Sequence, residues 1–316
     1  MMKAISKLLF LPLALIVLFT QCEKEPNPVN FPDDAFLTAL ISVGADTNGD
    51  GIISVSEAEA IDTLDIHGRL IKSLEGIAAF VNLVYLECFN NELIHLDLSM
   101  NSKLEELDCS TNQLTSLEVS NCIHLSILDC SSNQLTSLDV SNNTVLTELH
   151  CDSNQLSSLD ISNCIQLVRF LCTYNQLFNL DISKNNALDL LRCEANQLTS
   201  LDISKNTSLS DLNCALNQLT ELNVSNNTNL LQLCCYHNHI ADLDISNNTM
   251  LENLCFSGNQ LTSLDISKNT SLTDIYLDDM PSLNEVCVWT TPFPPDGVWV
   301  VRVNSPNINF TTECSK

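Results

Sequence analysis

Residues 83–103 read LVYLECFNNELIHLDLSMNSK, and the same arrangement of residues returns repeatedly along the chain. The leucine that opens this stretch recurs at every twenty-first position, as Leu83, Leu104, Leu125, Leu146, Leu167, Leu188, Leu209, Leu230, Leu251 and Leu272. The common pattern of these units is LxxLxCxxNxLxxLDISxNx. A period of this length is typical of stacked supersecondary units, so the sequence predicts a solenoid rather than a domain with one globular core.

The first segment of each unit has the alternation expected of a β-strand. In residues 85–89, Leu86 and Cys88 point to one side and the other three residues point to the opposite side. Stacked units should therefore form a parallel sheet with one buried face and one open face. The second apolar pair of each unit, as in LDVS at residues 138–141, favours a short strand or turn on the back, because so short a unit leaves little room for a helix.

Over residues 64–283 the pattern LxxLxCxxNxL resembles the LxxLxLxxNxL signature of leucine-rich repeat proteins, with Cys in place of one Leu. The flanking layout is also similar to that of internalin-like bacterial surface leucine-rich repeat lipoproteins. The resemblance implies a β-rich solenoid with a parallel sheet on its concave face, a short helical N-terminal cap (residues 33–63) and a β C-terminal cap (residues 280–316). Residues 64–279 are assigned to the repeats, of which the first is degenerate, as expected where an array must be closed.

Residues 1–21 have the form of a signal peptide, with two lysines ahead of an apolar run that is too short for a comfortable membrane span. The run ends in LFTQC at residues 18–22, which resembles a lipobox and implies lipidation of Cys22. Residues 22–32 would then be a lipidated tether. Glu23 and Glu25 are similar to signals that send some lipoproteins to the outer face of the outer membrane, so the chain is expected at the cell surface, with membrane contact only through lipid. A secretory signal with an incidental cysteine is the alternative.

Residues 46–57, DTNGDGIISVSE, fit the template of an EF-hand calcium loop. The ligand oxygens are expected from Asp46, Asn48, Asp50, Ile52 (through its backbone carbonyl), Ser54 and Glu57. Gly51 permits the sharp turn at the sixth position. Because the loop is single and the helix after it (residues 56–62) is short, the sequence predicts a structural Ca²⁺ that rigidifies the N-terminal cap rather than a sensor. The alternative is a turn whose acidic side chains are only solvated.

Most of the 15 cysteines follow the repeat. Eight share one inward position and are expected to be small buried hydrophobes: Cys88, Cys109, Cys130, Cys151, Cys172, Cys193, Cys214 and Cys235. Parallel strands hold their Cβ atoms nearly 5 Å apart along parallel vectors, which disulfides tolerate poorly. Cys234 and Cys255 should face outward on adjacent strands, and a metal site with His237 is disfavoured because that residue should lie a turn away. Cys287 and Cys314 are predicted to form a disulfide that closes the C-terminal cap.

Two columns of asparagine follow the same period, one after the strand and one on the opposite turn, and we interpret both as satisfying backbone groups of the turns. From Met280 the period fails. The segments VCVW (residues 286–289) and VWVVRV (residues 298–303) suggest a strand pair, with Trp289 and Trp299 covering the last repeat.

The amino-acid sequence disfavours two classes of function, nucleic-acid binding and catalysis. The formal charge is −26, from 39 acidic and 13 basic residues, which disfavours nucleic acid as a partner. The sequence contains no GxSxG, no HExxH and only seven glycines, so an enzyme has no support. A surface-anchored recognition module and a structural spacer of the cell envelope remain.

The open face of the sheet is acidic in the early repeats and changes in the middle. Arg and Tyr are favoured in binding hot spots. The predicted ligand-binding face therefore comprises Arg169, Leu171, Tyr174, Arg192, Tyr236 and His237, and the two arginines would receive an acidic group. We expect a monomeric, adhesin-like, non-enzymatic module that binds a protein or a surface glycan, with the structural spacer as the alternative.

Overall fold

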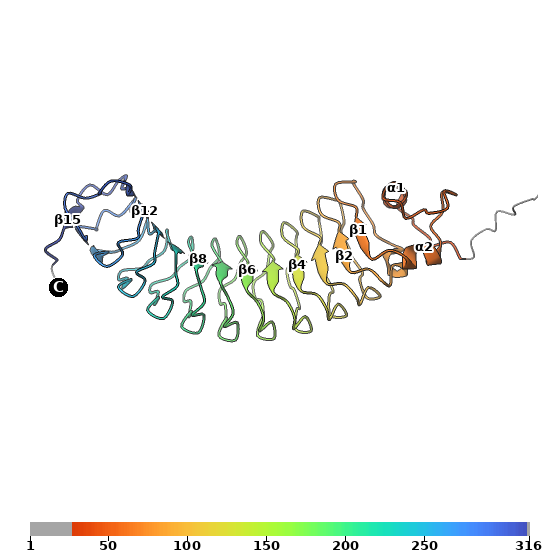
Figure 1. Ribbon diagram of the computed structural model, residues 1–316, viewed down its shortest axis with the longest axis horizontal. Coiled ribbons are helices and arrows are strands. Elements are labelled where there is room, and N and C mark those ends of the chain that lie inside the picture. Colours follow the sequence, from red (N-terminus) through yellow and green to blue (C-terminus); the bar gives the residue numbers. More distant parts are fainter. Residues whose placement is uncertain (1–26, 315–316) are drawn as a thin grey trace, which may run out of the picture.

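The computed structural model describes residues 27–314, so the predicted signal peptide and Cys22 lie outside the described residues. Short strands and turns stack along an arc, with two helices at its N-terminal end (Figure 1). The prediction of a β-rich leucine-rich repeat solenoid with a parallel sheet is confirmed. No helix among residues 27–314 is long and apolar enough to cross a membrane.

Twelve three-residue strands form one parallel sheet that runs the length of the solenoid. They are β1 (Thr63–Asp65), β2 (Tyr85–Glu87), β3 (Glu106–Asp108), β4 (Ile127–Asp129), β5 (Glu148–His150), β6 (Arg169–Leu171), β7 (Leu190–Arg192), β8 (Asp211–Asn213), β9 (Gln232–Cys234), β10 (Asn253–Cys255), β12 (Asp274–Tyr276) and β14 (Trp299–Val301). The middle residue of each strand is paired with the middle residue of the next, for example Leu149 with Phe170. This register keeps every inward side chain in one continuous core.

A second, three-stranded parallel sheet lies at the C-terminal end and contains β11 (Ser263–Asp265), β13 (Glu285–Cys287) and β15 (Asn309–Thr311). The predicted pairing of residues 286–289 with residues 298–303 is therefore wrong, because β13 pairs with β11 and β15 whereas β14 pairs with β12. The chain keeps winding after residue 280, so its successive strands fall alternately in the two sheets.

The predicted role of the two tryptophans is correct for only one of them. Trp289 is partly buried against the core and meets Phe293 edge-on, with ring centroids 5.1 Å apart. Trp299 is 65% exposed, because as the first residue of β14 it points away from the core. A disulfide joins Cys287 to Cys314, with their Cα atoms 5.4 Å apart.

The N-terminal cap consists of α1 (Asp34–Ser42) and α2 (Val55–Glu59), and a 3₁₀ helix, η1 (Ile77–Ala79), follows in the first repeat. Asp33 caps α1 by accepting hydrogen bonds from the amides of Ala35 and Phe36. Its second oxygen accepts from the amides of residues 72 and 73, which ties the cap to the array. The helix α2 is shorter than predicted because its chain turns toward β1 directly after residue 60.

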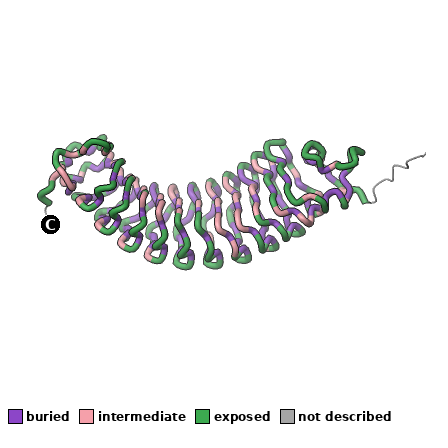
Figure 2. The backbone as a smooth tube through the Cα atoms, in the orientation of Figure 1, coloured by how far each residue is buried: buried purple, intermediate pink, exposed green. Residues whose placement is uncertain are grey.

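The interior consists of repeated columns, so buried and exposed segments alternate along each turn (Figure 2). All eight cysteines of the inward column are fully buried, as predicted. In the first asparagine column, Asn112 accepts from the amide of Leu93 and donates to the carbonyls of Cys88 and Cys109. In the second column the amide nitrogen of Asn143 donates to two carbonyls, but its Oδ1 accepts nothing from residues 27–314. The second column thus satisfies carbonyls only, which corrects the expectation that both columns serve both kinds of group.

Candidate binding surface on the outer face of the sheet

The first and third residues of each strand point away from the core, and so does the residue two positions after the strand. We call these outward side chains of the twelve-stranded sheet the outer face. Its backbone is identical from strand to strand, so its chemistry depends only on which side chains occupy these positions.

A column of four carboxylates crosses the N-terminal part of the outer face. The third residues of β1, β2, β3 and β4 are register neighbours, and they are Asp65, Glu87, Asp108 and Asp129. Adjacent strands lie about 4.8 Å apart, and like charges directly opposite each other are destabilising. This arrangement makes this part of the outer face strongly favourable for positively charged groups.

A histidine stands at each end of the carboxylate column. Nδ1 of His67 lies 2.5 Å from Oδ1 of Asp65, and the His67 ring stacks on Phe89 with centroids 4.4 Å apart. At the other end, Nδ1 of His150 lies 3.5 Å from Oδ2 of Asp129. Among the described residues, Asp65, His67 and Glu87 form the one group of three potential metal ligands within 4.8 Å of one another, and all three are exposed.

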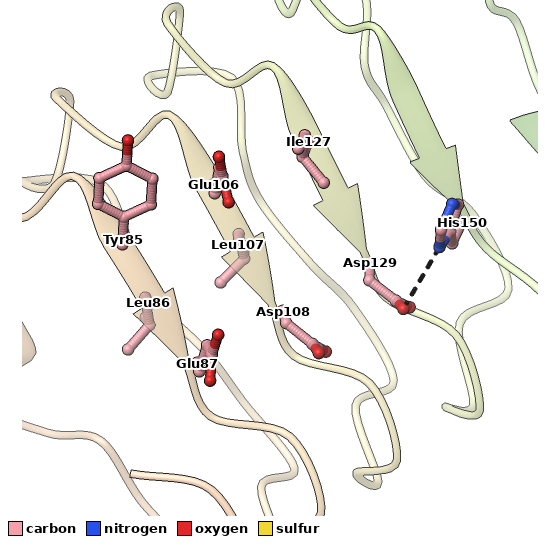
Figure 3. A pocket seen from close by; sticks show the side chains of 9 residues that line it. All are labelled: Tyr85, Leu86, Glu87, Glu106, Leu107, Asp108, Ile127, Asp129 and His150. Carbon is pink, nitrogen blue, oxygen red and sulfur yellow. Dashed lines mark ion pairs between the residues drawn. The ribbon is translucent and has the colours of Figure 1, made fainter. Parts of the chain in front are cut away.

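A hollow of about 240 Å³ lies over β2 to β5. Figure 3 shows Tyr85, Glu106 and Ile127 along one side of it, three carboxylates along the other side, and His150 at its far end. The four carboxylates of the hollow are those of Glu87, Glu106, Asp108 and Asp129. Apolar walls beside several carboxylates suit a long side chain with an aliphatic stem and a cationic head, which is the form of lysine and arginine.

The hollow contains a titratable pair. The hydrogen bond with Asp129 raises the pKa of His150, against the opposing effect of its burial. Burial raises the pKa of Asp129, but its hydrogen bonds with His150 and Ser131 outweigh that effect and the pKa is lowered. Nε2 of His150 also lies 3.7 Å from Oε2 of Glu148. The imidazolium form is thus favoured, and it partly neutralises one end of the carboxylate column.

The arginines of the predicted ligand-binding face already have carboxylate partners on neighbouring strands. Nε of Arg169 lies 3.4 Å from Oε2 of Glu148, and Nη2 of Arg192 donates to Oδ2 of Asp211 at 3.0 Å. Both arginine side chains are more than 40% exposed, so each pair is worth only about 0–1 kcal/mol and can be exchanged for another partner.

The other members of that predicted face lie in two places. Leu171 is the register neighbour of Arg192, and Tyr174, 60% exposed, follows β6 in the turn with a φ of 50°. Tyr236 and His237 follow β9, two strands beyond β7, with their ring centroids 5.6 Å apart. The His237 ring occupies the space where a Cβ on Gly258 would lie, so a side chain at residue 258 would have to displace this ring. The ligand-binding face of the central repeats stays a prediction.

The predicted calcium loop is held by its own hydrogen bonds. Asp46 accepts from the amides of Gly49 and Gly51, and Gly51 has a φ of 81°. Glu57 is buried and accepts from the amides of Thr47 and Ser54 and from both of their hydroxyls. Burial alone raises the pKa of Glu57, but these hydrogen bonds outweigh it and bring the pKa to about 2.

The oxygen donors of this loop are of the kind that calcium prefers, namely carboxylates, an amide, a hydroxyl and a backbone carbonyl. Its three carboxylates do not lie within 4.8 Å of one another in the described structure. Residues 46–57 therefore fit calcium in donor chemistry. Binding would require Glu57 to exchange some of its hydrogen bonds for the ion.

The hollow over β2 to β5 is a feature that the sequence analysis missed. The sequence predicts that the early strands are acidic. It does not predict that their carboxylates lie beside Tyr85, Ile127 and His150. The signal was present in the sequence, because Glu87, Asp108, Asp129 and His150 follow one another at the spacing of the repeat. Aligned by this period, the outward positions place these four residues in one column, as the inward positions do for the cysteines.

No protein-family model and no curated protein sequence matches this chain. Among solved structures, its fold is similar to the functional domain of InlJ from Listeria monocytogenes, described as including a cysteine ladder, with a TM-score of 0.70 and 28% identity over 89% of this chain and 70% of that one. It is also similar to the internalin InlF of L. monocytogenes, with a TM-score of 0.67 and 20% identity over 93% of this chain and 100% of that one. A leucine-rich repeat protein of Leptospira interrogans gives 0.63 and 22% over 81% and 67% of the two chains. Bacterial internalins are therefore among its structural neighbours.

Proposed function

We propose that this protein is a non-enzymatic protein-binding module and that the acidic hollow over β2 to β5 receives a basic segment of its partner. The observation that carries the proposal is the row of three register-paired carboxylates in the hollow, opposite the row that holds Tyr85 and Ile127, with histidine as the basic residue that lines the hollow. Lysine or arginine stems would pack on Tyr85 and Ile127 while their charged heads reach the carboxylates.

The charge of the whole chain supports the same partner. A net charge of −26 attracts a basic protein from a distance and raises its association rate, and added salt reduces both effects. Arg169, Leu171, Tyr174 and Arg192, on the next strands and the turn after β6, would contact the partner beside the hollow. The weak ion pairs of Arg169 and Arg192 can be exchanged for contacts with acidic groups of the partner.

We also propose that the chain acts as a monomer anchored through a lipid on Cys22 at the surface of the outer membrane. In this arrangement the N-terminal cap lies between the anchor and the array, so its stiffness affects how the outer face is presented. Calcium in the loop of residues 46–57 would rigidify that cap, which Asp33 ties to the first repeat. Calorimetry with CaCl₂ tests this point: Glu57→Gln should weaken binding at least tenfold, and equal binding by wild type and variant contradicts it.

The main test measures binding of residues 23–316 to a panel of immobilised basic, neutral and acidic proteins and glycans, with calcium present. A hollow variant carries Glu87→Gln, Glu106→Gln, Asp108→Asn and Asp129→Asn. A matched control removes four exposed acidic groups outside the strands, through Glu75→Gln, Glu221→Gln, Asp242→Asn and Glu252→Gln. A basic ligand should bind wild type and control alike and bind the hollow variant at least tenfold more weakly, which corresponds to about 1.4 kcal/mol or more.

A third variant separates the hollow from the central repeats. It changes Arg169, Tyr174, Arg192 and Tyr236 to alanine and leaves every carboxylate of the hollow in place. If only this variant loses the ligand, the binding site lies on the central strands and the role proposed for the hollow is wrong. If wild type binds nothing on the panel, the structural spacer becomes the better explanation.

A further inference from the structure

Two cysteines on the outer face differ from all the other free cysteines of residues 27–314. Ten of the twelve free cysteines in this range are buried, whereas Cys234 and Cys255 are only half-buried. Burial raises the pKa of each thiol in the inward column, for example Cys172 and Cys193. It also makes these thiols inaccessible to solvent. Among the free cysteines of residues 27–314, only Cys234 and Cys255 are accessible to solvent.

The two thiols lie side by side. Cys234 is the third residue of β9, Cys255 is the third residue of β10, and the two are register partners in the parallel sheet. Their side chains are in hydrogen-bond contact, and Sγ of Cys255 lies 3.1 Å from Oδ1 of Asn253. The hydrogen bond between the thiols raises the pKa of Cys234 and lowers that of Cys255, so the two thiols titrate as a pair.

The geometry of a parallel sheet disfavours a direct bond between these sulfurs. Adjacent strands hold equivalent Cβ atoms about 4.8 Å apart on parallel vectors, whereas a disulfide needs about 3.5–4.5 Å. An ion between two thiolates meets no such conflict. With metal–sulfur bonds of about 2.3 Å, the length found in zinc sites, one ion can bridge sulfurs up to about 4.6 Å apart, which is close to the strand spacing.

The surroundings of the pair favour an ion that accepts two ligands. No further His, Cys, Asp or Glu of residues 27–314 brings a ligand atom within 4.8 Å of both thiols, because the one such three-ligand group in this range is at β1 and β2. His237 is directed over Gly258 instead. Soft thiolates bind both zinc and Cu(I), but zinc prefers four ligands in a tetrahedral site, so a pair of thiolates without further ligands favours Cu(I).

We propose that Cys234 and Cys255 form a binding site for one soft monovalent cation of the Cu(I) class on the C-terminal half of the outer face. Binding one Cu(I) by both thiols releases two protons and forms two metal–sulfur bonds, with no change in oxidation state. The site on β9 and β10 begins four strands beyond β5, the last strand of the acidic hollow, so it does not depend on the function proposed for that hollow.

The test is anaerobic titration of residues 23–316 with Cu(I) supplied as its acetonitrile complex, in the presence of a competing Cu(I) chelator, read by native mass spectrometry. Wild type should retain one Cu(I) per folded chain. Cys234→Ser and Cys255→Ser should each lose affinity at least 100-fold, and circular dichroism should show that both remain folded. Zn²⁺ under the same conditions should not be retained.

Cys122→Asn is the matched control. It also removes one cysteine, but it restores the asparagine that occupies this column in most repeats, and it should retain one Cu(I). The proposal is overturned if wild type loses all Cu(I) to the chelator, if either serine variant retains it, or if Zn²⁺ is held equally well. A wild-type mass lower by two hydrogens, from a Cys234–Cys255 disulfide that excludes the metal, also overturns it.

Discussion

The inward residues of the twelve-stranded sheet are nearly the same from β2 to β10, whereas the outward residues change from strand to strand. On β5, Leu149 is fully buried between the equivalent leucine of β4 and Phe170 of β6. Glu148 and His150, on either side of it in the chain, face solvent and contact charged groups of neighbouring strands. The two faces share one backbone but are constrained differently.

This difference has a physical reason. Each inward side chain packs against two copies of its own column, so a change of size leaves a cavity or a clash on both sides. An outward side chain has solvent on one side and can change its charge at little cost to stability. Stability should therefore be concentrated on the inner face, and recognition on the outer face.

The largest expected effect separates the two faces directly. Phe170→Ala removes a fully buried side chain from the middle of β6 and should lower the free energy of unfolding by about 3–5 kcal/mol. Arg169→Ala, at the preceding residue, should lower it by about 0–1 kcal/mol. Urea unfolding followed by circular dichroism measures both. Comparable losses in the two variants are incompatible with the proposed division between the faces.

A second prediction compares the two asparagine columns. Asn133→Ala leaves the amide of Leu114 without its acceptor and removes one of two asparagine donors from each of two carbonyls, those of Cys109 and Cys130, so it should cost about 2–4 kcal/mol. Asn143→Ala removes one donor from each of two carbonyls that keep a backbone amide donor, and it should cost about 1–3 kcal/mol. The same unfolding measurement ranks them. If Asn143→Ala lowers the free energy of unfolding more than Asn133→Ala does, the extra acceptor role assigned to the first column is wrong.

A third prediction concerns acid stability of the N-terminal cap. The pKa of Glu57 is about 2 in the folded protein, below its ordinary value of 4.5. Its contribution to stability is therefore fully present above pH 4.5 and is lost as the pH falls from about 4.5 to about 2. The hydrogen-exchange protection factors of the Thr47 and Ser54 amides, measured without calcium, should fall across this window. The fall should be absent in Glu57→Gln, and its persistence there would point to another carboxyl group.

The smallest expected effect lies in the acidic hollow. Because the folded pKa of His150 is raised above its ordinary value of 6.5, its pairing with Asp129 contributes stability that is fully present below about pH 6.5 and is lost as the pH rises through the folded pKa. The contribution should be below about 1 kcal/mol for this partly exposed pair. NMR titration of the His150 ring measures the pKa, and Asp129→Asn should lower it. An unchanged value in that variant would remove Asp129 as the cause.

Much of the fold followed from the sequence because a constant period places identical residues in register. The spacing of the leucines and cysteines indicated the parallel sheet, the buried face and the inertness of the inward thiols. The N-terminal helix was also indicated, since Asp33 precedes an apolar face and is a good N-cap residue. The C-terminal strands were assigned wrongly because residues 280–314 lack the period, and apolar alternation alone does not say to which of two sheets a strand belongs.

The sequence by itself determined the repeat, the direction of each strand residue and the acidic character of the outer face, because these depend on local alternation and a constant period. Only the tertiary structure decided which outward groups meet. The pairing of Arg169 with Glu148, the hollow between Tyr85 and His150, and the contact of Cys234 with Cys255 join residues from different turns of the solenoid. Such contacts depend on side-chain direction across neighbouring strands, which a period along one chain does not contain.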